Sequence, residues 1–289
     1  MAKVGFGSKA FYLKKNKVPT FCLLPFAFCL LIFSLSCRAR GTLLNQAQAA
    51  WDRNDYPTAV THYEEYLKDA PSPEQAAHVH FEAAKIYYLN LKQYDRAAEH
   101  YIRLIEDFPQ FPKREQAYHQ LAECFELMKK PREAISEYES LLIAFPDTPE
   151  RRKVRLAVAD LYNDYDQSQA LVEYQKVVKD VLYDELSEKA YLRIGGVRYV
   201  RGNFEAAIPA YQAIDQNTKD PGIRRQARER LADCYEGMVN YDKAVEILEH
   251  TESDSNDPTY WQKRIEGIRE RQRTRKLIQP APTPEEKNN

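Results

Sequence analysis

Glycine is scarce in this chain of 289 residues, with only nine glycines against twenty tyrosines and twelve phenylalanines. Glycine supplies the backbone freedom that tight turns between short strands need, and it weakens helices. A high share of aromatic side chains suits helices that pack through large apolar contacts. The composition therefore favours an all-α fold over an architecture of strands and turns.

The motifs of common catalytic and metal centres are also missing. The sequence contains no G-x-G-x-x-G, no phosphate-binding loop and no H-E-x-x-H. No C-x-x-C or Cys/His spacing indicates a metal site, and the six histidines are dispersed along the chain. We therefore expect no catalytic residue, no metal and no cofactor.

Negative charge is absent from residues 1–36, which hold five lysines and no acid. The whole chain has a formal net charge of −1, so the remaining residues together carry −6. Nucleic-acid binding depends largely on cations that neutralise phosphates. A mildly acidic body gives no reason to expect nucleic acid as a partner.

Charge of either sign is absent from Val18 to Cys37, a segment that is mostly apolar and follows the basic residues 14–17. A basic stretch followed by an apolar segment is typical of an export signal. Its end, Ser-Leu-Ser-Cys at residues 34–37, resembles the lipobox of bacterial lipoproteins. That resemblance implies a signal over residues 1–36 and a lipid on Cys37.

Two other interpretations of this segment remain open. About 20 apolar residues can span a bilayer, so residues 18–37 could stay as an uncleaved membrane helix, and ordinary cleavage without a lipid is the third reading. All three place the body outside the cytoplasm. We expect an outer-membrane lipoprotein that faces the periplasm, with an inner-membrane anchor and a periplasmic body as the alternative.

A repeat of about 37 residues runs through the rest of the chain. Its clearest mark is an alanine followed four residues later by a large side chain, and such a pair shares one face of a helix. The alanines are Ala59, Ala97, Ala134, Ala170, Ala207 and Ala244. The large residues are Tyr63, Tyr101, Tyr138, Tyr174, Tyr211 and Leu248.

Two further positions recur in the same register. Aromatic residues stand three places before four of these alanines, at Tyr56, Tyr94, Phe204 and Tyr241. Small residues recur in the helix upstream, at Ala84, Ala122, Ala159, Gly195 and Ala232. The pattern resembles the tetratricopeptide repeat, which implies about six helical hairpins in a right-handed α-solenoid over residues 37–257. A single short hairpin cannot bury its apolar face alone, so the hairpins must stack.

Prolines are expected to close the repeats by stopping the second helix of each hairpin. They are Pro71, Pro109, Pro146, Pro221 and Pro258. The fourth repeat reads VLY at residues 181–183 and has no such proline, so its second helix is expected to end differently. Cys124 and Cys234 occupy equivalent positions three repeats apart, and we expect both to be buried core residues.

A capping helix is predicted over residues 258–278, followed by a disordered tail over residues 279–289. Trp261, Ile265 and Ile268 repeat at helical spacing and can cover the last hairpin. The helix is basic through Lys263, Arg264, Arg269, Arg271, Arg273, Arg275 and Lys276. Two interpretations remain open: a solvated outer face, or contact with anionic lipid or an acidic partner.

The family resemblance also implies a binding surface, because tetratricopeptide arrays take peptides or helices on a concave surface lined by first helices. The predicted groove residues are Trp51, Tyr88, His119, Glu123, Glu126, Asp160, Asn163, Asp164, Tyr199, Asp233 and Glu236. Such a groove would be acidic with aromatic islands, which favours a basic or neutral ligand. An ordinary solvated face remains the alternative.

The export signal, the repeat body and the turns FPQFP and FPDTP together resemble the BamD family of outer-membrane lipoproteins. Periplasmic Tol-Pal coordinators of the YbgF/CpoB type are similar but carry no lipid. The resemblance implies a non-enzymatic scaffold that binds other envelope proteins, with barrel assembly subunits as the expected partners. The alternatives are an adaptor of another envelope machine, such as a pilus, secretion or cell-wall complex, and a small-ligand binder or enzyme.

Overall fold

The structure is a computed structural model that describes residues 41–253 and 258–278. The described residues form helices joined by short turns, and they contain no strand. None of the described helices is both long enough and apolar enough to cross a bilayer. The predicted signal at residues 1–36, the predicted lipid site Cys37 and the predicted tail at residues 279–289 lie outside the described residues.

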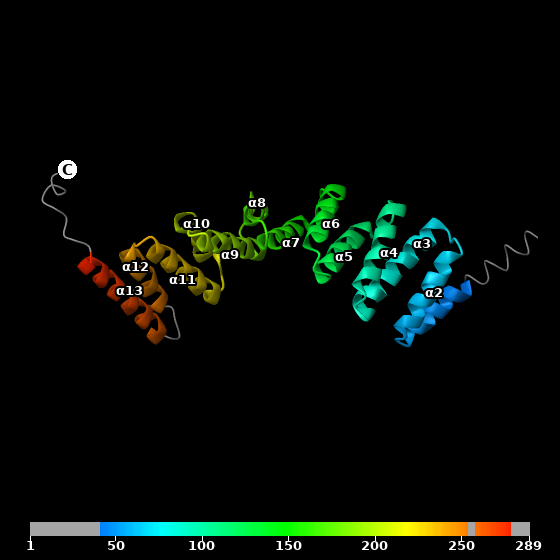
Figure 1. The fold of residues 1–289 in the computed structure, drawn as a ribbon, viewed down its shortest axis with the longest axis horizontal. Helices are drawn as coiled ribbons and strands as arrows, with labels where there is room; N and C mark the ends of the chain where they lie inside the picture. Colours follow the sequence, from blue (N-terminus) through cyan, green and yellow to red (C-terminus); the bar gives the residue numbers. More distant parts are fainter. Residues whose placement is uncertain (1–40, 254–257, 279–289) are drawn as a thin grey trace, which may run out of the picture. The chain divides into compact units, whose positions relative to one another are not determined.

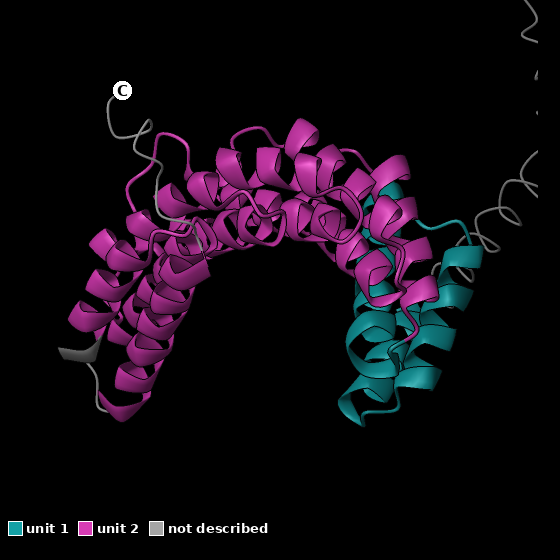
Figure 2. Cartoon of the chain, turned by 60° about the vertical axis from the view of Figure 1, so that its left-hand side comes forward, with its two compact units in different colours: residues 1–92 teal, residues 93–289 magenta. Residues whose placement is uncertain are grey.

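The chain divides into two compact units, residues 1–92 and residues 93–289 (Figure 2). In unit 1, a helix over residues 41–52 is followed by α2 (Tyr56–Lys68) and α3 (Pro73–Lys85). A π-helical turn, η2 (Ile86–Leu91), continues α3, and Lys92 ends it with a positive φ of 55°. The boundary between the units therefore falls in the turn inside the second predicted hairpin.

Unit 2 is a stack of helices in which each helix packs against the next one along the chain (Figure 1). The helices are α4 (Tyr94–Asp107), α5 (Arg114–Leu127), α6 (Pro131–Ala144), α7 (Arg151–Asn163), α8 (Gln167–Val178), α9 (Glu185–Val200), α10 (Phe204–Asn217), α11 (Pro221–Gly237), α12 (Tyr241–Ser253) and α13 (Pro258–Ile278). The prediction of an all-α array of helical hairpins is confirmed. The continuity of the array between residues 92 and 93 stays a prediction.

The recurring small residues are buried between packed helices. The six alanines of the second helices, from Ala59 to Ala244, are 0% exposed. Gly195 of α9 is buried under the ring of Tyr211 from α10, and a Cβ atom at Gly195 would lie 2.6 Å from a ring carbon. The register predicted from the repeat is therefore the register of the core.

The prolines have two different roles. Pro71, Pro109 and Pro146 follow the ends of α2, α4 and α6, as predicted. Pro221 and Pro258, in contrast, are the first residues of α11 and α13, so the prediction that they close a helix is wrong. The first turn of a helix does not need the N–H that proline lacks, and the fixed φ of proline suits it.

A polar clamp ends the fourth repeat in place of a proline. The helix α8 stops at Val178, and Asp180 turns the chain with a φ of 55°. The guanidinium of Arg152 donates from Nε to the carbonyl of Val177 at 2.9 Å and from Nη2 to Asp184 at 2.8 Å. Asp184 in turn caps α9, because its carboxylate accepts the N–H of Ser187 at 2.9 Å. One arginine thus links the end of α8 to the start of α9.

The last helix, α13, closes the stack as a cap. Its residues Trp261, Ile265 and Ile268 are buried against α12. The residues of α11 that pack against α10 have the same spacing: Ala227, Leu231 and Cys234. In that register, Ala232 and Tyr235 of α11 pack against α12, whereas α13 presents the exposed Glu266 and Arg269. At these two positions α13 therefore carries charged side chains where α11 carries side chains that pack against the next helix.

Candidate functional site

The first helices of the hairpins carry the predicted groove residues. Trp51 and Tyr88 lie in unit 1, where Trp51 packs edge-on against Tyr56 with ring centroids 5.3 Å apart. The other predicted residues lie in unit 2, on or at the end of α5, α7, α9 and α11. We call this side of α5, α7, α9, α11 and α13 the first-helix face.

Tyrosines of the second helices hold carboxylates of this face in place. The hydroxyl of Tyr138 donates to Glu126 at 2.6 Å, and the hydroxyl of Tyr174 donates to Asp160 at 2.6 Å. Burial, together with the hydrogen bond to Asp160, raises the pKa of Tyr174 well above its usual value. In these two repeats, the tyrosine four residues after the repeat alanine therefore fills the core with its ring and orients a groove carboxylate with its hydroxyl.

Arginines of the following first helix pair with the same face. Arg193 of α9 donates to Asp160 of α7 at 3.0 Å. Arg264 of α13 bridges Asp233 at 2.5 Å and Glu236 at 3.1 Å, both on α11. Much of the negative charge on this face is therefore balanced inside the fold. The prediction of an acidic groove was based on the carboxylates alone. It did not include the arginines of the next repeat, which pair with those carboxylates.

A hollow of about 510 Å³ lies on the first-helix face beside His119. The ring of His119 packs against Tyr138 with centroids 5.6 Å apart, and its Nδ1 lies 3.3 Å from the carboxylate of Glu123. The hollow, which we call the α5–α7 hollow, is lined by Pro112, Lys113, Glu115, Gln116, His119, Gln120, Glu123, Leu141, Glu150 and Lys153. It offers hydrogen-bond donors, acceptors and both signs of charge.

A smaller hollow of about 230 Å³ lies one repeat further on and brings together Asn163, Gln167, Leu192, Arg193, Gly196, Val197 and Val200. A Cβ atom at Gly196 would meet nothing within 4 Å, so the backbone of α9 is open there. The amide oxygen of Asn163 is buried and has no hydrogen-bond partner among the described residues. Asp164 ends α7 as its C-cap, and Tyr199 packs edge-on against Phe204.

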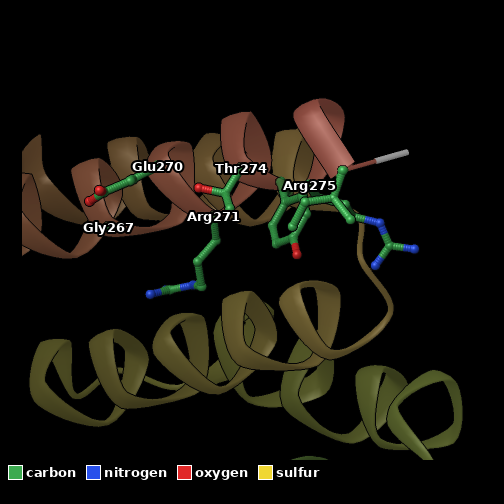
Figure 3. Close-up of a pocket in the computed structure, with 7 residues that line it drawn as sticks. Gly267, Glu270, Arg271, Thr274 and Arg275 are labelled. Carbon is green, nitrogen blue, oxygen red and sulfur yellow. The ribbon is translucent and has the colours of Figure 1, made fainter. Parts of the chain in front are cut away.

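A further hollow on this face, of about 670 Å³, lies along α13 (Figure 3). This α13 hollow is lined by Tyr241, Gly267, Glu270, Arg271, Thr274, Arg275 and Ile278. Arg271 and Arg275 were expected as basic residues of the capping helix, but this helix was not expected to form part of the groove. The signal was present, because residues 267, 270, 271, 274, 275 and 278 follow the spacing of one helix face.

Unit 1 has a hollow of its own, of about 590 Å³, on the side of residues 41–52 and α3. Its walls include Tyr63, His78 and Glu82, together with Leu44, Asn45, Gln48, Glu74, Gln75 and Val79. Each unit therefore carries an accessible polar hollow next to the first helices of its hairpins.

The side chains of the described residues offer binding chemistry. No group of three His, Cys, Asp or Glu residues within residues 41–253 and 258–278 could hold a metal ion. Cys124 and Cys234 are free and buried, and burial raises their pKa to about 12 and about 11. A thiol with such a pKa is a poor nucleophile at neutral pH. The residues that line the hollows of this face offer hydrogen bonds, ion pairs and apolar contact.

Solved structures of similar fold include repeat proteins from several sources. A tetratricopeptide repeat protein from Parabacteroides merdae ATCC 43184 is 15% identical, with a TM-score of 0.48 over 82% of this chain and 89% of that one. The MamA protein is 16% identical, with a TM-score of 0.49 over 63% of this chain and 93% of that one. YrrB, described as a tetratricopeptide protein with an unusual peptide-binding site, is 17% identical, with a TM-score of 0.48 over 70% of this chain and 96% of that one.

The family assignment comes from the sequence. No curated protein matches it. A family model described as tetratricopeptide repeat matches residues 44–112. A second family model, described as Intraflagellar transport protein 56, matches residues 83–259, which is more than half of the chain. The chain therefore belongs to the tetratricopeptide-repeat family, whose arrays serve as protein-interaction scaffolds, and its larger part falls under the family model described as Intraflagellar transport protein 56.

Proposed function

We propose that this chain is a non-enzymatic scaffold that binds other proteins on its first-helix face while it is held at a bacterial envelope membrane. The observation that carries the proposal is that hydrogen bonds within the fold hold polar side chains of that face in fixed positions. The hydroxyls of Tyr138 and Tyr174, on second helices, fix the positions of Glu126 and Asp160 by hydrogen bonds. Arg193 fixes Asp160 from the next repeat.

Such fixed side chains lower the cost of binding a partner. A surface side chain that must be immobilised on binding costs about 0.5–1.5 kcal/mol of conformational entropy. Groups already held by hydrogen bonds have lost that freedom in the free protein. The α5–α7 hollow adds depth, because about 510 Å³ is enough space for side chains of a bound segment.

The proposed place of action rests on the sequence at the N-terminus. The basic and then apolar pattern of residues 1–36, which ends at Cys37, supports a lipid anchor at the outer membrane with the body in the periplasm. An inner-membrane anchor is the alternative. The intraflagellar transport model matches residues 83–259 and so concerns the repeat body alone.

Among envelope scaffolds, we propose a role in outer-membrane protein assembly like that of the BamD family. The support is the combination of a lipobox-like cysteine, a body made of these repeats and the two F-P-x-x-P turns. An adaptor of a pilus, secretion or cell-wall complex would share the first two features. The identity of the bound proteins distinguishes these roles.

A pull-down from detergent-solubilised envelope tests the proposal. The tagged full chain should retain barrel assembly subunits, and components of another envelope machine in their place would reject the specific role. Gln116 is an exposed wall of the α5–α7 hollow, so Gln116→Trp should fill the hollow and release the partner. Ser136 is exposed on α6 and lines none of the hollows described above, so Ser136→Trp is the matched control. Equal retention by both variants would reject binding at this hollow.

A further inference from the structure

Six of the seven basic residues of α13 fall into two groups with different surroundings, and the seventh, Lys263, is exposed near the start of the helix. Towards its start, Arg264 pairs with Asp233 and Glu236, Arg269 pairs with Glu249, and Arg271 pairs with Glu236 at 2.6 Å. These pairs hold α13 to α11 and α12. The first group of cations is therefore used by the fold itself.

Towards the end of α13 the cations have no such partners. Arg273, Arg275 and Lys276 are exposed, and none of them forms an ion pair with the described residues. The nearby acid Asp242 already accepts a hydrogen bond from Gln272 at 2.8 Å. A positive patch consequently remains at this end of the helix.

Apolar side chains accompany this patch. The last residue of α13 that is buried is Ile268, and Gln272 still contacts Asp242 of α12, so residues 273–278 extend about 9 Å beyond these contacts. At the tip of that extension, Leu277 is 86% exposed and Ile278 is 76% exposed. Ile278 and Tyr241 form apolar parts of the wall of the α13 hollow.

We propose that the α13 hollow binds an acidic segment of a partner protein. Carboxylates of that segment pair with Arg275 and its neighbour Lys276, and an aliphatic or aromatic side chain enters the hollow between Tyr241 and Ile278. This inference rests on the proposed scaffold function and adds a second recognition site to it, of opposite charge to the groove that the sequence predicts. Charge complementarity selects the partner and speeds its encounter.

The charges around the site favour a polypeptide over a membrane surface. The hollow, of about 670 Å³, is open to solvent and can receive a side chain, whereas a bilayer presents a broad surface of headgroups. Glu270 also lines the hollow, and its charge repels a dense layer of phosphates (Figure 3). A peptide can avoid Glu270 by placing its carboxylates on the side of Arg275, which leaves α13 in a different direction in Figure 3.

Fluorescence anisotropy with the full chain in detergent tests this site. The probe is a fluorescein-labelled peptide with two leucines and a phenylalanine between pairs of glutamates, and its counterpart has lysines in place of the glutamates. The acidic peptide should bind at least about 10-fold more tightly than the basic one, and added salt should weaken it. Equal binding of the two peptides would overturn the proposal.

Charge variants of one helix supply the controls. Arg275→Glu should weaken binding of the acidic peptide about 10-fold or more, which is about 1.4 kcal/mol. Lys263→Glu makes the same charge change about 18 Å away along α13 and should alter binding less than about twofold. Glu270→Gln should tighten binding, because it removes the one acidic side chain from the wall. If Arg275→Glu and Lys263→Glu weaken binding of the acidic peptide equally, the proposed site is wrong.

Two further outcomes separate this inference from the proposed function. Binding of the full chain to phosphatidylglycerol vesicles that depends on Arg275, without binding of the acidic peptide, would replace the protein partner with a lipid surface and overturn the inference. Gln116→Trp should leave peptide binding unchanged, because Gln116 lies on α5. If the peptide fails to bind while the pull-down still depends on Gln116, the inference fails and the scaffold function stands.

Discussion

Gly195 of α9 and Tyr211 of α10 are in direct contact: a Cβ atom at Gly195 would lie 2.6 Å from the ring carbon Cζ of Tyr211. Real Cβ atoms do not approach a ring that closely. Glycine at this position thus allows α9 and α10 to form their hairpin around a tyrosine. A Cβ atom at the adjacent Gly196 would meet no other atom within 4 Å.

These two neighbouring glycines give a matched pair of variants. Gly195→Ala should destabilise the array by about 1–3 kcal/mol, because the methyl group forces Tyr211 to move. Gly196→Ala should stabilise it by roughly 0.5–1 kcal/mol, because alanine is the better helix former and meets nothing. Urea unfolding of the two variants measures both effects. Effects of the same sign would show that the register of α9 against α10 is wrong.

The clamp between Arg152 and Asp184 should make stability depend on pH. The pKa of the Asp184 carboxyl lies well below its usual 3.8, chiefly because the side chain of Arg152 donates hydrogen bonds to it. A carboxyl with a lower pKa in the folded state adds stability above its unfolded pKa and loses it as the pH falls through the folded value. Asp184→Asn keeps the N-cap of α9 but loses the charge.

Since Asp184 is 46% exposed, solvent screens the pair, and Asp184→Asn should cost about 1 kcal/mol or less at pH 7. The difference between the variant and the parent should shrink as the pH falls below about 4. Melting temperatures measured from pH 7 to pH 3 check this. A difference that stays constant over that range would show that the charge of Asp184 contributes nothing.

Cys124 and Cys234 should resist thiol reagents in the folded protein. Both are 0% exposed, and the thiolate is the reactive form. At pH 8 we expect a thiol reagent to label these two residues only after the protein is unfolded in guanidinium. Peptide mass spectrometry measures the labelling of each cysteine. Labelling within minutes under native conditions would contradict the burial of α5 and α11 in the array.

The lipid on Cys37 is tested by Cys37→Ala. If the cysteine is acylated, the variant should be released from membranes or accumulate as a larger, unprocessed precursor. Membrane fractionation and intact mass measure both consequences. An unchanged mass and an unchanged membrane fraction would reject lipidation and leave an uncleaved helix over residues 18–37 as the better reading.

The sequence predicts the core of this fold better than its polar surface. The repeat alanines and tyrosines were predictable because a helix of 3.6 residues per turn places residues i and i+4 on one face, whatever lies around it. The pairing of Asp160 with Arg193 joins residues on successive first helices, and spacing within one helix does not report it. The acidic groove was therefore predicted with too much free negative charge.

The ends of helices were harder to predict from the sequence than the core, because the same type of residue can either end a helix or begin one. Proline stops a helix and also starts one, so Pro221 alone could not show that it opens α11. The end of α8 depends on Arg152, which lies in the preceding helix α7. Neither the start of α11 at Pro221 nor the contact of Arg152 with the end of α8 can be predicted from the residues around it in the sequence.

The central claim is that protein partners bind on the first-helix face. Site-specific photocrosslinking in cells tests it most directly, with a photoreactive amino acid placed in the full chain at Gln116 or, in a second variant, at Ser136. The account predicts crosslinks to a defined envelope protein from residue 116 and none from residue 136. Crosslinks from residue 136 alone, or equal crosslinks from both, would contradict it.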